Sequence, residues 1–228
     1  MDATTSMRPR LRHTRRAGWL AAPLLALLGG CGPTQFEAQA VIPPPLITRI
    51  PVVVGVYMPA EFREAVHREE HDGVDYEIAI GKSQSAGFDR LLTAMFERVV
   101  PVAAPGAGAA TDPAIRGVLE PVLEEFSFVT PQDTGDSMYA VSLRYRINAY
   151  TPSGQPVDSW TFTGYGAQPG SSMPGPGSGP LQKAAAIAMR DAGAKLAVEF
   201  REQAIARGLI EAAPAAAEPA PAETQPPP

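Results

Sequence analysis

Hydrophobic and polar positions along the chain follow the two-residue period of strands in some segments and the 3.6-residue period of helices in others. Residues 50–58, IPVVVGVYM, form a short Val-rich apolar run, which predicts a buried strand. Residues 59–71 begin with Pro59 and are followed by Gly73, so this segment is interpreted as a short helix. Residues 76–80 alternate apolar and polar positions, which predicts a second strand.

A long helical pattern follows the second predicted strand. Its apolar residues fall at i, i+3, i+4, i+7, i+8 and i+11: Phe88, Leu91, Leu92, Met95, Phe96 and Val99. This stripe predicts an amphipathic helix with one face on a core. Gly81 allows the chain to leave the preceding strand, and Ser83 or Ser85 is expected to cap the helix.

Three strands and a final helix are predicted in the second half of the chain. Residues 118–129 indicate a strand that is bulged or at a sheet edge, because they contain Pro121. Residues 139–150 alternate regularly, and residues 157–166 return as a hairpin partner after the turn TPSGQP. Residues 181–209 predict a long Ala-rich helix. Its small side chains permit a close approach to a sheet: Ala185, Ala188 and Ala192.

This order of elements predicts an α+β fold. We expect a mostly antiparallel sheet of four to five strands, with two main helices packed on one face. Residues 48–210 form a single domain of ordinary size in this interpretation. Residues 31–47 are expected to form a lipidated N-terminus and a Pro-rich spacer, and residues 211–228 a disordered Pro/Ala-rich tail.

The N-terminus has the pattern of a secretory signal. Five arginines precede the apolar run AGWLAAPLLALLGG, which has about 14 residues, whereas a membrane-spanning helix needs roughly 20. Residues 1–30 are therefore interpreted as a signal peptide. Its removal takes away five arginines and one aspartate, which leaves 14 basic and 23 acidic residues and a formal charge of −9. This acidic balance argues against nucleic-acid binding and against a chain lying flat on anionic lipid.

The end of the apolar run resembles the lipobox of bacterial lipoproteins. It reads Leu28-Gly29-Gly30-Cys31, and Cys31 is the only cysteine of the chain. The resemblance implies cleavage after Gly30 and attachment of acyl chains to Cys31, which would anchor the protein to a membrane. In enteric bacteria an Asp after the lipidated cysteine favours the inner membrane. Gly32 occupies that position here, which favours the outer membrane.

Residues 67–71, HREEH, match the order H-x-x-E-H of inverted zinc peptidases. On a helix, His67 and His71 would lie one turn apart and bind zinc, while Glu70 would activate a water molecule. So short a motif often occurs by chance. We therefore interpret the segment as the solvated end of a helix and keep a zinc metallopeptidase as a further alternative.

Residues 80–83, IGKS, resemble the end of a phosphate-binding loop. The complete motif needs a glycine five positions before Gly81, where this chain has Tyr76, so nucleotide binding is not expected. The polar face of the strand 139–150 carries Arg144, Arg146 and Asn148, which could bind an anion or simply face solvent.

The lipobox, the proline-rich segment and the element order together resemble small periplasm-facing lipoproteins that assist envelope machinery. The lipopolysaccharide-assembly lipoprotein and the auxiliary lipoproteins of envelope lipid transporters are of this kind. The resemblance covers residues 31–210 at the level of architecture. It implies a non-enzymatic accessory factor on the periplasmic face of the outer membrane, without a cofactor and with an envelope protein as partner. The alternative is a lipid or glycan carrier with a cleft beside Phe88, Phe96 and Trp160.

Overall fold

The computed structural model describes five stretches of the chain: residues 34–38, 45–71, 73–135, 137–170 and 178–211. The signal segment, the lipobox cysteine and the C-terminal tail lie outside the described residues: 1–30, Cys31 and 212–228.

The described residues form helices and two mixed sheets, so the predicted α+β class is correct. The larger sheet has the strand order β5, β2, β6, β7, β8. These strands are β2 Ile50–Val56, β5 Phe96–Pro101, β6 Gly117–Val129, β7 Met138–Tyr150 and β8 Pro156–Pro169. Strands β6, β7 and β8 are antiparallel, whereas β2 is parallel to both of its neighbours. The prediction of a mostly antiparallel sheet of four to five strands is wrong, because a crossover through helix α2 (Gly81–Met95) joins β2 to β5 in parallel.

The smaller sheet has three strands in the order β1, β4, β3. They are β1 Thr34–Glu37, β3 Val66–His71 and β4 Val74–Ala79. Strand β1 lies within the range expected to be a spacer, yet it pairs in parallel with β4, from Thr34 opposite Tyr76 to Glu37 opposite Ala79. This part of the chain is therefore packed on the domain.

The predicted helix over 59–71 is mostly wrong. Only α1, Ala60–Arg63, is helical, and the following residues form β3. Strand β3 pairs antiparallel with β4, from Val66 opposite Ala79 to His71 opposite Val74. Gly73 has a φ of 75° in the tight turn between them, so it closes a hairpin and does not end a helix. The pairing with an established neighbouring strand overrides the local pattern.

Helix α2 ends earlier than the apolar stripe predicts. Its last residue is Met95, and Phe96 begins β5 in an extended conformation. Phe96 is fully buried as expected, but on a strand, since the β-branched pair Val99 and Val100 follows it. The expected serine cap is also wrong, because the N-cap residue is Ile80 and the Ser85 hydroxyl donates to the Gly81 carbonyl.

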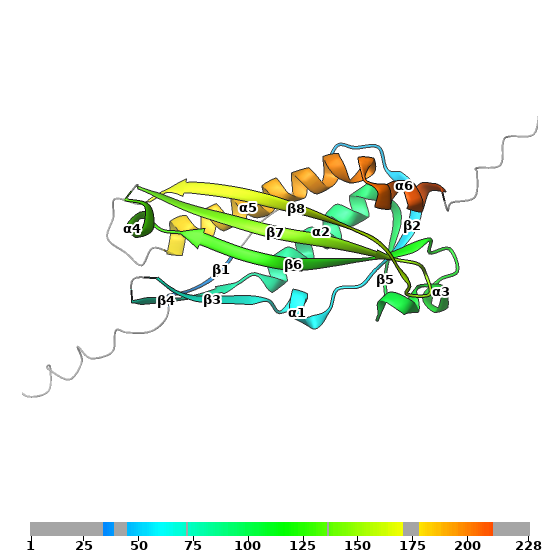
Figure 1. Ribbon diagram of the computed structural model, residues 1–228, viewed down its shortest axis with the longest axis horizontal. Coiled ribbons are helices and arrows are strands. Elements are labelled where there is room, and N and C mark those ends of the chain that lie inside the picture. Colours follow the sequence, from blue (N-terminus) through cyan, green and yellow to red (C-terminus); the bar gives the residue numbers. More distant parts are fainter. Residues whose placement is uncertain (1–33, 39–44, 72, 136, 171–177, 212–228) are drawn as a thin grey trace, which may run out of the picture. The chain divides into compact units, whose positions relative to one another are not determined.

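The long C-terminal helix is interrupted. Helix α5 covers Ser178–Glu199, a 3-10 turn covers Phe200–Glu202, and α6 covers Ala204–Glu211. The buried Phe200 packs on Phe96 and Trp160 at the break. The remaining short helices are a 3-10 turn at Pro105–Ala107, α3 at Gly108–Thr111 and α4 at Pro131–Thr134. Figure 1 shows α2 and α5 together on one face of the larger sheet, which agrees with the predicted placement of the two main helices.

Aromatic rings fill the space between the helices and the larger sheet. Neighbouring ring centroids lie 4.7 to 6.1 Å apart. The series runs Phe62, Phe88, Tyr145, Phe162, Trp160, Phe200 and Phe96. The buried Tyr145 hydroxyl donates to Gln84 Oε1 at 3.2 Å, and burial raises the pKa of this tyrosine. Phe88, Phe96 and Trp160, beside which the sequence predicts a cleft in a lipid carrier, all belong to this packed series of rings.

Candidate functional site

The HREEH segment does not have the geometry of a zinc peptidase. Successive side chains of a strand point to opposite faces, so His67, Glu69 and His71 share one face of β3 and Glu70 lies on the other. The His67 ring packs 4.7 Å from Phe126, and the His71 ring 4.3 Å from Phe128. No group of three or more His, Cys, Asp or Glu side chains in the described stretches could hold a metal ion. The zinc hypothesis for His67, Glu70 and His71 is not supported by this arrangement.

The two histidines instead fasten the β3–β4 hairpin to β6. Glu69 reaches both rings, with Oε2 2.8 Å from His67 Nε2 and Oε1 2.8 Å from His71 Nε2. The contact between Glu69 and His71 lacks hydrogen-bond geometry, so the two groups are close without a hydrogen bond. Asp133 of α4 lies 3.4 Å from His71 Nδ1, and its pKa is lowered, mainly by hydrogen bonds from the Thr130 amide and hydroxyl. The contact of the β3–β4 hairpin with β6 therefore accounts for this group of histidine and carboxylate side chains.

The IGKS segment begins a helix and forms no open loop. The Gly81 amide donates to the Ala65 carbonyl at 2.9 Å. A side chain at Gly81 would collide with the backbone of Arg63 and Ala65, where α1 ends. The glycine is therefore required by close packing at this crossing.

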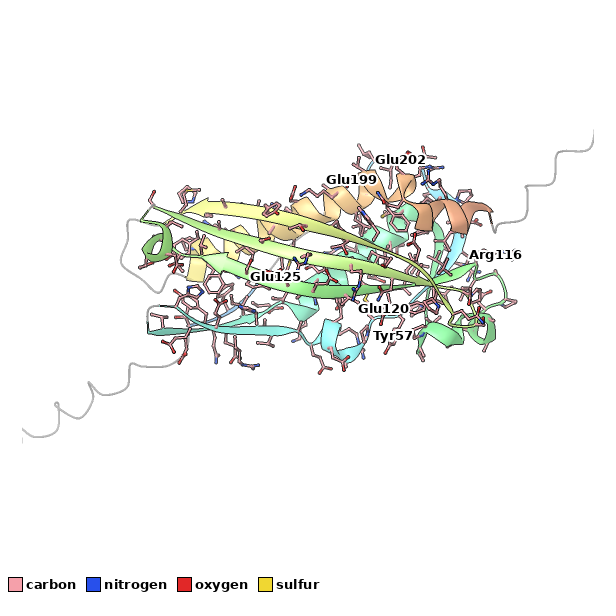
Figure 2. All side chains as sticks on the ribbon, viewed as in Figure 1. Tyr57, Arg116, Glu120, Glu125, Glu199 and Glu202 are labelled. Atoms are coloured by element: carbon pink, nitrogen blue, oxygen red, sulfur yellow. The ribbon has the colours of Figure 1, made fainter. Side chains whose placement is uncertain are left out.

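Carboxylates of β6 pair with the arginine side chains on the polar face of β7. Arg144 Nη2 lies 2.7 Å from Glu125 Oε2, and Arg146 Nη1 lies 3.0 Å from Glu124 Oε1. Further along, Glu120 accepts hydrogen bonds from Asn148 and from the Tyr150 hydroxyl, which raises the pKa of Tyr150. Glu120 and Glu125 are labelled along β6 in Figure 2. The cationic face considered from the sequence is thus paired with carboxylates and is a poor anion site.

Strand β8 is an edge of the larger sheet, and β7 is its one strand neighbour among the described residues. It has 14 residues, and two of its apolar side chains are largely exposed, Val157 at 62% and Tyr165 at 61%. Helix α5 covers part of the edge, because Lys195 Nζ donates to the Thr163 carbonyl and the Tyr165 amide donates to Asp191. Burial acts to raise the pKa of Asp191, but its bonds from Tyr165 and Lys195 lower it overall. Helix α5 thus occupies backbone groups of the edge at Thr163 and Tyr165. Val157 lies six residues before Thr163, away from these bonds.

A cleft of about 820 Å³ lies where the parallel strands β2 and β5 end. Aliphatic and aromatic side chains line most of it, and three charged side chains and one serine complete the lining. The polar members are Glu61, Arg63, Ser85 and Asp89, and the apolar members include Tyr57, Met58, Val99 and Val102. Its size is within the range of small-molecule sites, and the carboxyl ends of parallel strands often bind ligands.

The sequence does not predict the β8 edge or the cleft, because the solvent exposure of a side chain depends on the folded structure. Val157 and Tyr165 have the alternation of any hairpin strand, and the residues of the cleft come from three separate segments. Among the described residues, none of the helices has both the length and the hydropathy needed to cross a membrane.

Comparison with known proteins does not assign the chain to a family. No protein-family model matches the sequence, and no curated protein matches it. The fold is similar to that of protein XCC0632 from Xanthomonas campestris, described under the family model DUF330, with a TM-score of 0.43 and 13% identity over 72% of this chain and 92% of that one.

Two further solved structures are similar. A protein from Caulobacter crescentus, described as a candidate lipoprotein, has a TM-score of 0.39 and 12% identity over 64% of this chain and 88% of that one. The hypothetical protein CT253 from Chlamydia trachomatis has a TM-score of 0.39 and 9% identity over 72% of this chain and 99% of that one. With TM-scores of at most 0.43, these similarities establish no shared family or activity.

Proposed function

We propose that the protein is a lipoprotein anchored through acyl chains on Cys31 to the periplasmic face of the outer membrane. There it acts as a non-enzymatic accessory factor for envelope machinery and binds an envelope protein through β8. The observation that carries the binding role is the long edge strand with its exposed Val157 and Tyr165. An extended segment of a partner adds to such an edge through main-chain hydrogen bonds, and exposed apolar side chains supply additional contact area.

The guard on β8 supports a selective contact. Natural proteins protect sheet edges against indiscriminate pairing with charges, prolines or covering helices. Here Pro156 and Asp158 stand at the start of the strand, and α5 covers Thr163 and Tyr165. The partner would pair with residues 159–162, between these two protected ends of the strand, and Val157 would lie beside it.

The anchor is supported by the resemblance of residues 28–31 to a lipobox, and β1 begins soon after Cys31 in the chain. Thr34 is the third residue after Cys31. Three residues of extended chain span at most about 10 Å. A lipidated Cys31 would therefore hold the domain close to the bilayer, with β1 as the element nearest the anchor in the chain.

Site-specific photo-crosslinking in cells tests the binding surface. A photoreactive amino acid at Val157 is expected to capture one envelope protein in a fixed ratio. The control position is Val66 on β3, which is also exposed and apolar. Equal capture from both positions, or no capture from Val157, would reject β8 as the binding edge.

Membrane fractionation tests the anchor and its location. Cys31→Ser is expected to release the protein from membranes, because the acyl chains have no attachment site. Gly32→Asp in an enteric host is expected to shift the protein from the outer to the inner membrane. The native chain found in the soluble periplasmic fraction would contradict the proposed anchor.

The cleft at the ends of β2 and β5 favours a second candidate, a lipid or glycan binding protein. Its volume of about 820 Å³ accommodates a small molecule, and its lining combines apolar side chains with charges at Arg63 and Asp89. Mass spectrometry of the protein purified under native conditions tests this candidate. A bound lipid or glycan that is lost in Ala86→Trp, a substitution that fills the cleft from α2, would support it.

A further inference from the structure

The backbone of β8 has free hydrogen-bonding groups on its open side at Thr161. The Tyr165 amide donates to Asp191, and the Thr163 carbonyl accepts from Lys195, so both groups point away from β7. In an antiparallel pair, the two backbone groups of one residue point to the same side, and this side alternates along the strand. The Thr161 amide and carbonyl therefore point to the open edge as well. Among the described residues, no side chain bonds to them.

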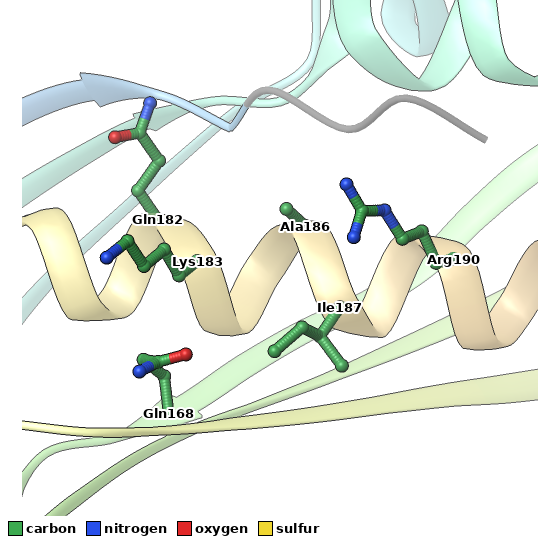
Figure 3. A pocket seen from close by; sticks show the side chains of 6 residues that line it. All are labelled: Gln168, Gln182, Lys183, Ala186, Ile187 and Arg190. Carbon is green, nitrogen blue, oxygen red and sulfur yellow. The ribbon is translucent and has the colours of Figure 1, made fainter. Parts of the chain in front are cut away.

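A groove of about 380 Å³ lies further along the same edge, between α5 and the end of β8. Its lining includes Lys183 and Ile187 of α5 and Gln168 of β8. Figure 3 shows Ile187 pointing from the helix toward the strand that carries Gln168. A Cβ atom at Gly166 would lie 2.9 Å from Ile187 Cβ, so the exposed Ile187 stands over β8 just before the groove.

Lys183 is the cation that this groove offers to a ligand. It is exposed and forms no ion pair or hydrogen bond within the described part of the chain. Arg190 also lines the groove, but it already interacts with another group of the domain and points to the other side of α5 from Gln168 (Figure 3). The described lining residues include no carboxylate, and Asp191 is paired with Lys195 at 3.0 Å. An ammonium and an amide side by side both donate hydrogen bonds to a carboxylate.

We infer that the envelope partner contributes an extended acidic segment, which pairs with β8 at Thr161 and places a carboxylate on Lys183. This inference rests on the proposed binding through β8. From Thr161 to Gln168 the strand spans about 23 Å, at about 3.3 Å per residue. An extended partner segment beside it therefore carries the carboxylate about seven residues from the residue that faces Thr161. Between these two points the segment passes the bonds from α5 without pairing and lies across Ile187.

Charge fixes the direction of the segment along the edge. Asp158 is exposed at the start of β8 and repels an acidic side chain there, whereas Lys183 attracts one at the far end. The chain as a whole has a formal charge of −5, so its surface does not attract acidic segments in general. The carboxylate therefore lies on the C-terminal side of the paired residues in a parallel arrangement and on their N-terminal side in an antiparallel one.

Two crosslinks within one envelope preparation test the inference. A photoreactive amino acid replaces the exposed Thr161 in the full-length protein and is activated by light. A carbodiimide, which joins an amine directly to a carboxylate, is then added, and mass spectrometry identifies the attached peptides. We expect one partner chain at both sites, with the carboxylate on Lys183 about seven residues from the residue joined at position 161. Lys82, an exposed lysine on α2, is the internal control and should not be joined to that segment.

Matched lysine variants separate the inference from the proposed binding edge. Lys183→Gln should lower the capture from position 161 about threefold, as expected for an exposed ion pair, and Lys82→Gln should leave it unchanged. Unchanged capture in Lys183→Gln would overturn the inference while the binding edge stands. A Lys183 crosslink to another protein, or to a distant part of the partner, would do the same. No capture from position 161 would reject the binding edge and the inference together.

Discussion

The two interfaces that close the core differ in the groups that make them. Where α5 crosses β8, Gly164 and Gly166 allow the backbones to meet, and alanines of α5 face them. Where β3 lies beside β6, histidine and phenylalanine rings pack at tilted angles, and Glu69 and Asp133 approach the histidines. The first interface is formed by closely packed glycine and alanine backbones, with polar bonds from Lys195 and to Asp191 at its edge. The second is partly polar and contains titratable groups at its centre.

This difference predicts opposite sensitivities. Close backbone packing is intolerant of added volume. Tilted ring contacts tolerate a change of shape at modest cost, and charged groups respond to pH. Three measurements examine these expectations, from the largest expected effect to the smallest.

Adding one methyl group at the α5–β8 interface is expected to be strongly destabilising. A Cβ atom at Gly166 would collide with the backbone at Ala184 and Ala188, so Gly166→Ala should lower the free energy of unfolding by about 3 kcal/mol. Gly179→Ala is the matched control, because no atom lies within 4 Å of its added methyl group. Chemical denaturation measures both. Similar stability of the two variants would show that α5 shifts easily on the sheet.

A change of shape at the β3–β6 interface should have a smaller and more local effect. Phe128→Leu removes the ring contacts with His71 at 4.3 Å and with Tyr76 at 5.1 Å but keeps most of the volume. We expect a loss of about 1 kcal/mol. Hydrogen exchange should accelerate in β3 and β4 and stay unchanged in α5. Acceleration throughout the domain would indicate that the hairpin does not open on its own.

The smallest effect concerns pH. The pKa of Asp133 is lowered from 3.8 by its bonds to Thr130 and by His71, so its stabilising contribution is complete above this value and is lost as the pH falls through the lower, folded-state pKa. Asp133→Asn should cost less than about 1 kcal/mol at neutral pH, because the group is exposed to solvent. Thermal unfolding from pH 6 to pH 2 should show the two proteins converging at the acidic end. A constant difference would mean that ionisation of Asp133 contributes nothing.

Much of the element order follows from local patterns. The alternation over 139–150 predicts β7, and Pro121 correctly indicates an irregular strand, since the pairing of β6 with β7 shifts register between Leu123 and Glu125. The small residues of 181–209 predict a helix in close contact with a sheet, and Ala185, Ala188 and Ala192 are buried there. These features depend on side-chain periodicity and size, which sequence contains directly.

The remaining features depend on partners distant in the sequence. HREEH has helical charge spacing, but β4 provides a strand to pair with, and this places Glu70 on the opposite face from His67 and His71. Phe96 belongs to β5 because β2 lies beside it. Pairing of a short segment is decided by the neighbour it finds, and such a neighbour leaves no mark in the local pattern.

The sequence by itself determined the α+β class, the amphipathic helix and the long hairpin, and its resemblance to a lipobox predicts a membrane anchor. The tertiary structure decided the mixed strand order, the exposed edge of β8 and the cleft at the ends of β2 and β5. The physical reason is that periodicity and composition are properties of single segments. Edges, clefts and grooves are formed only when segments meet, so their residues become neighbours through folding.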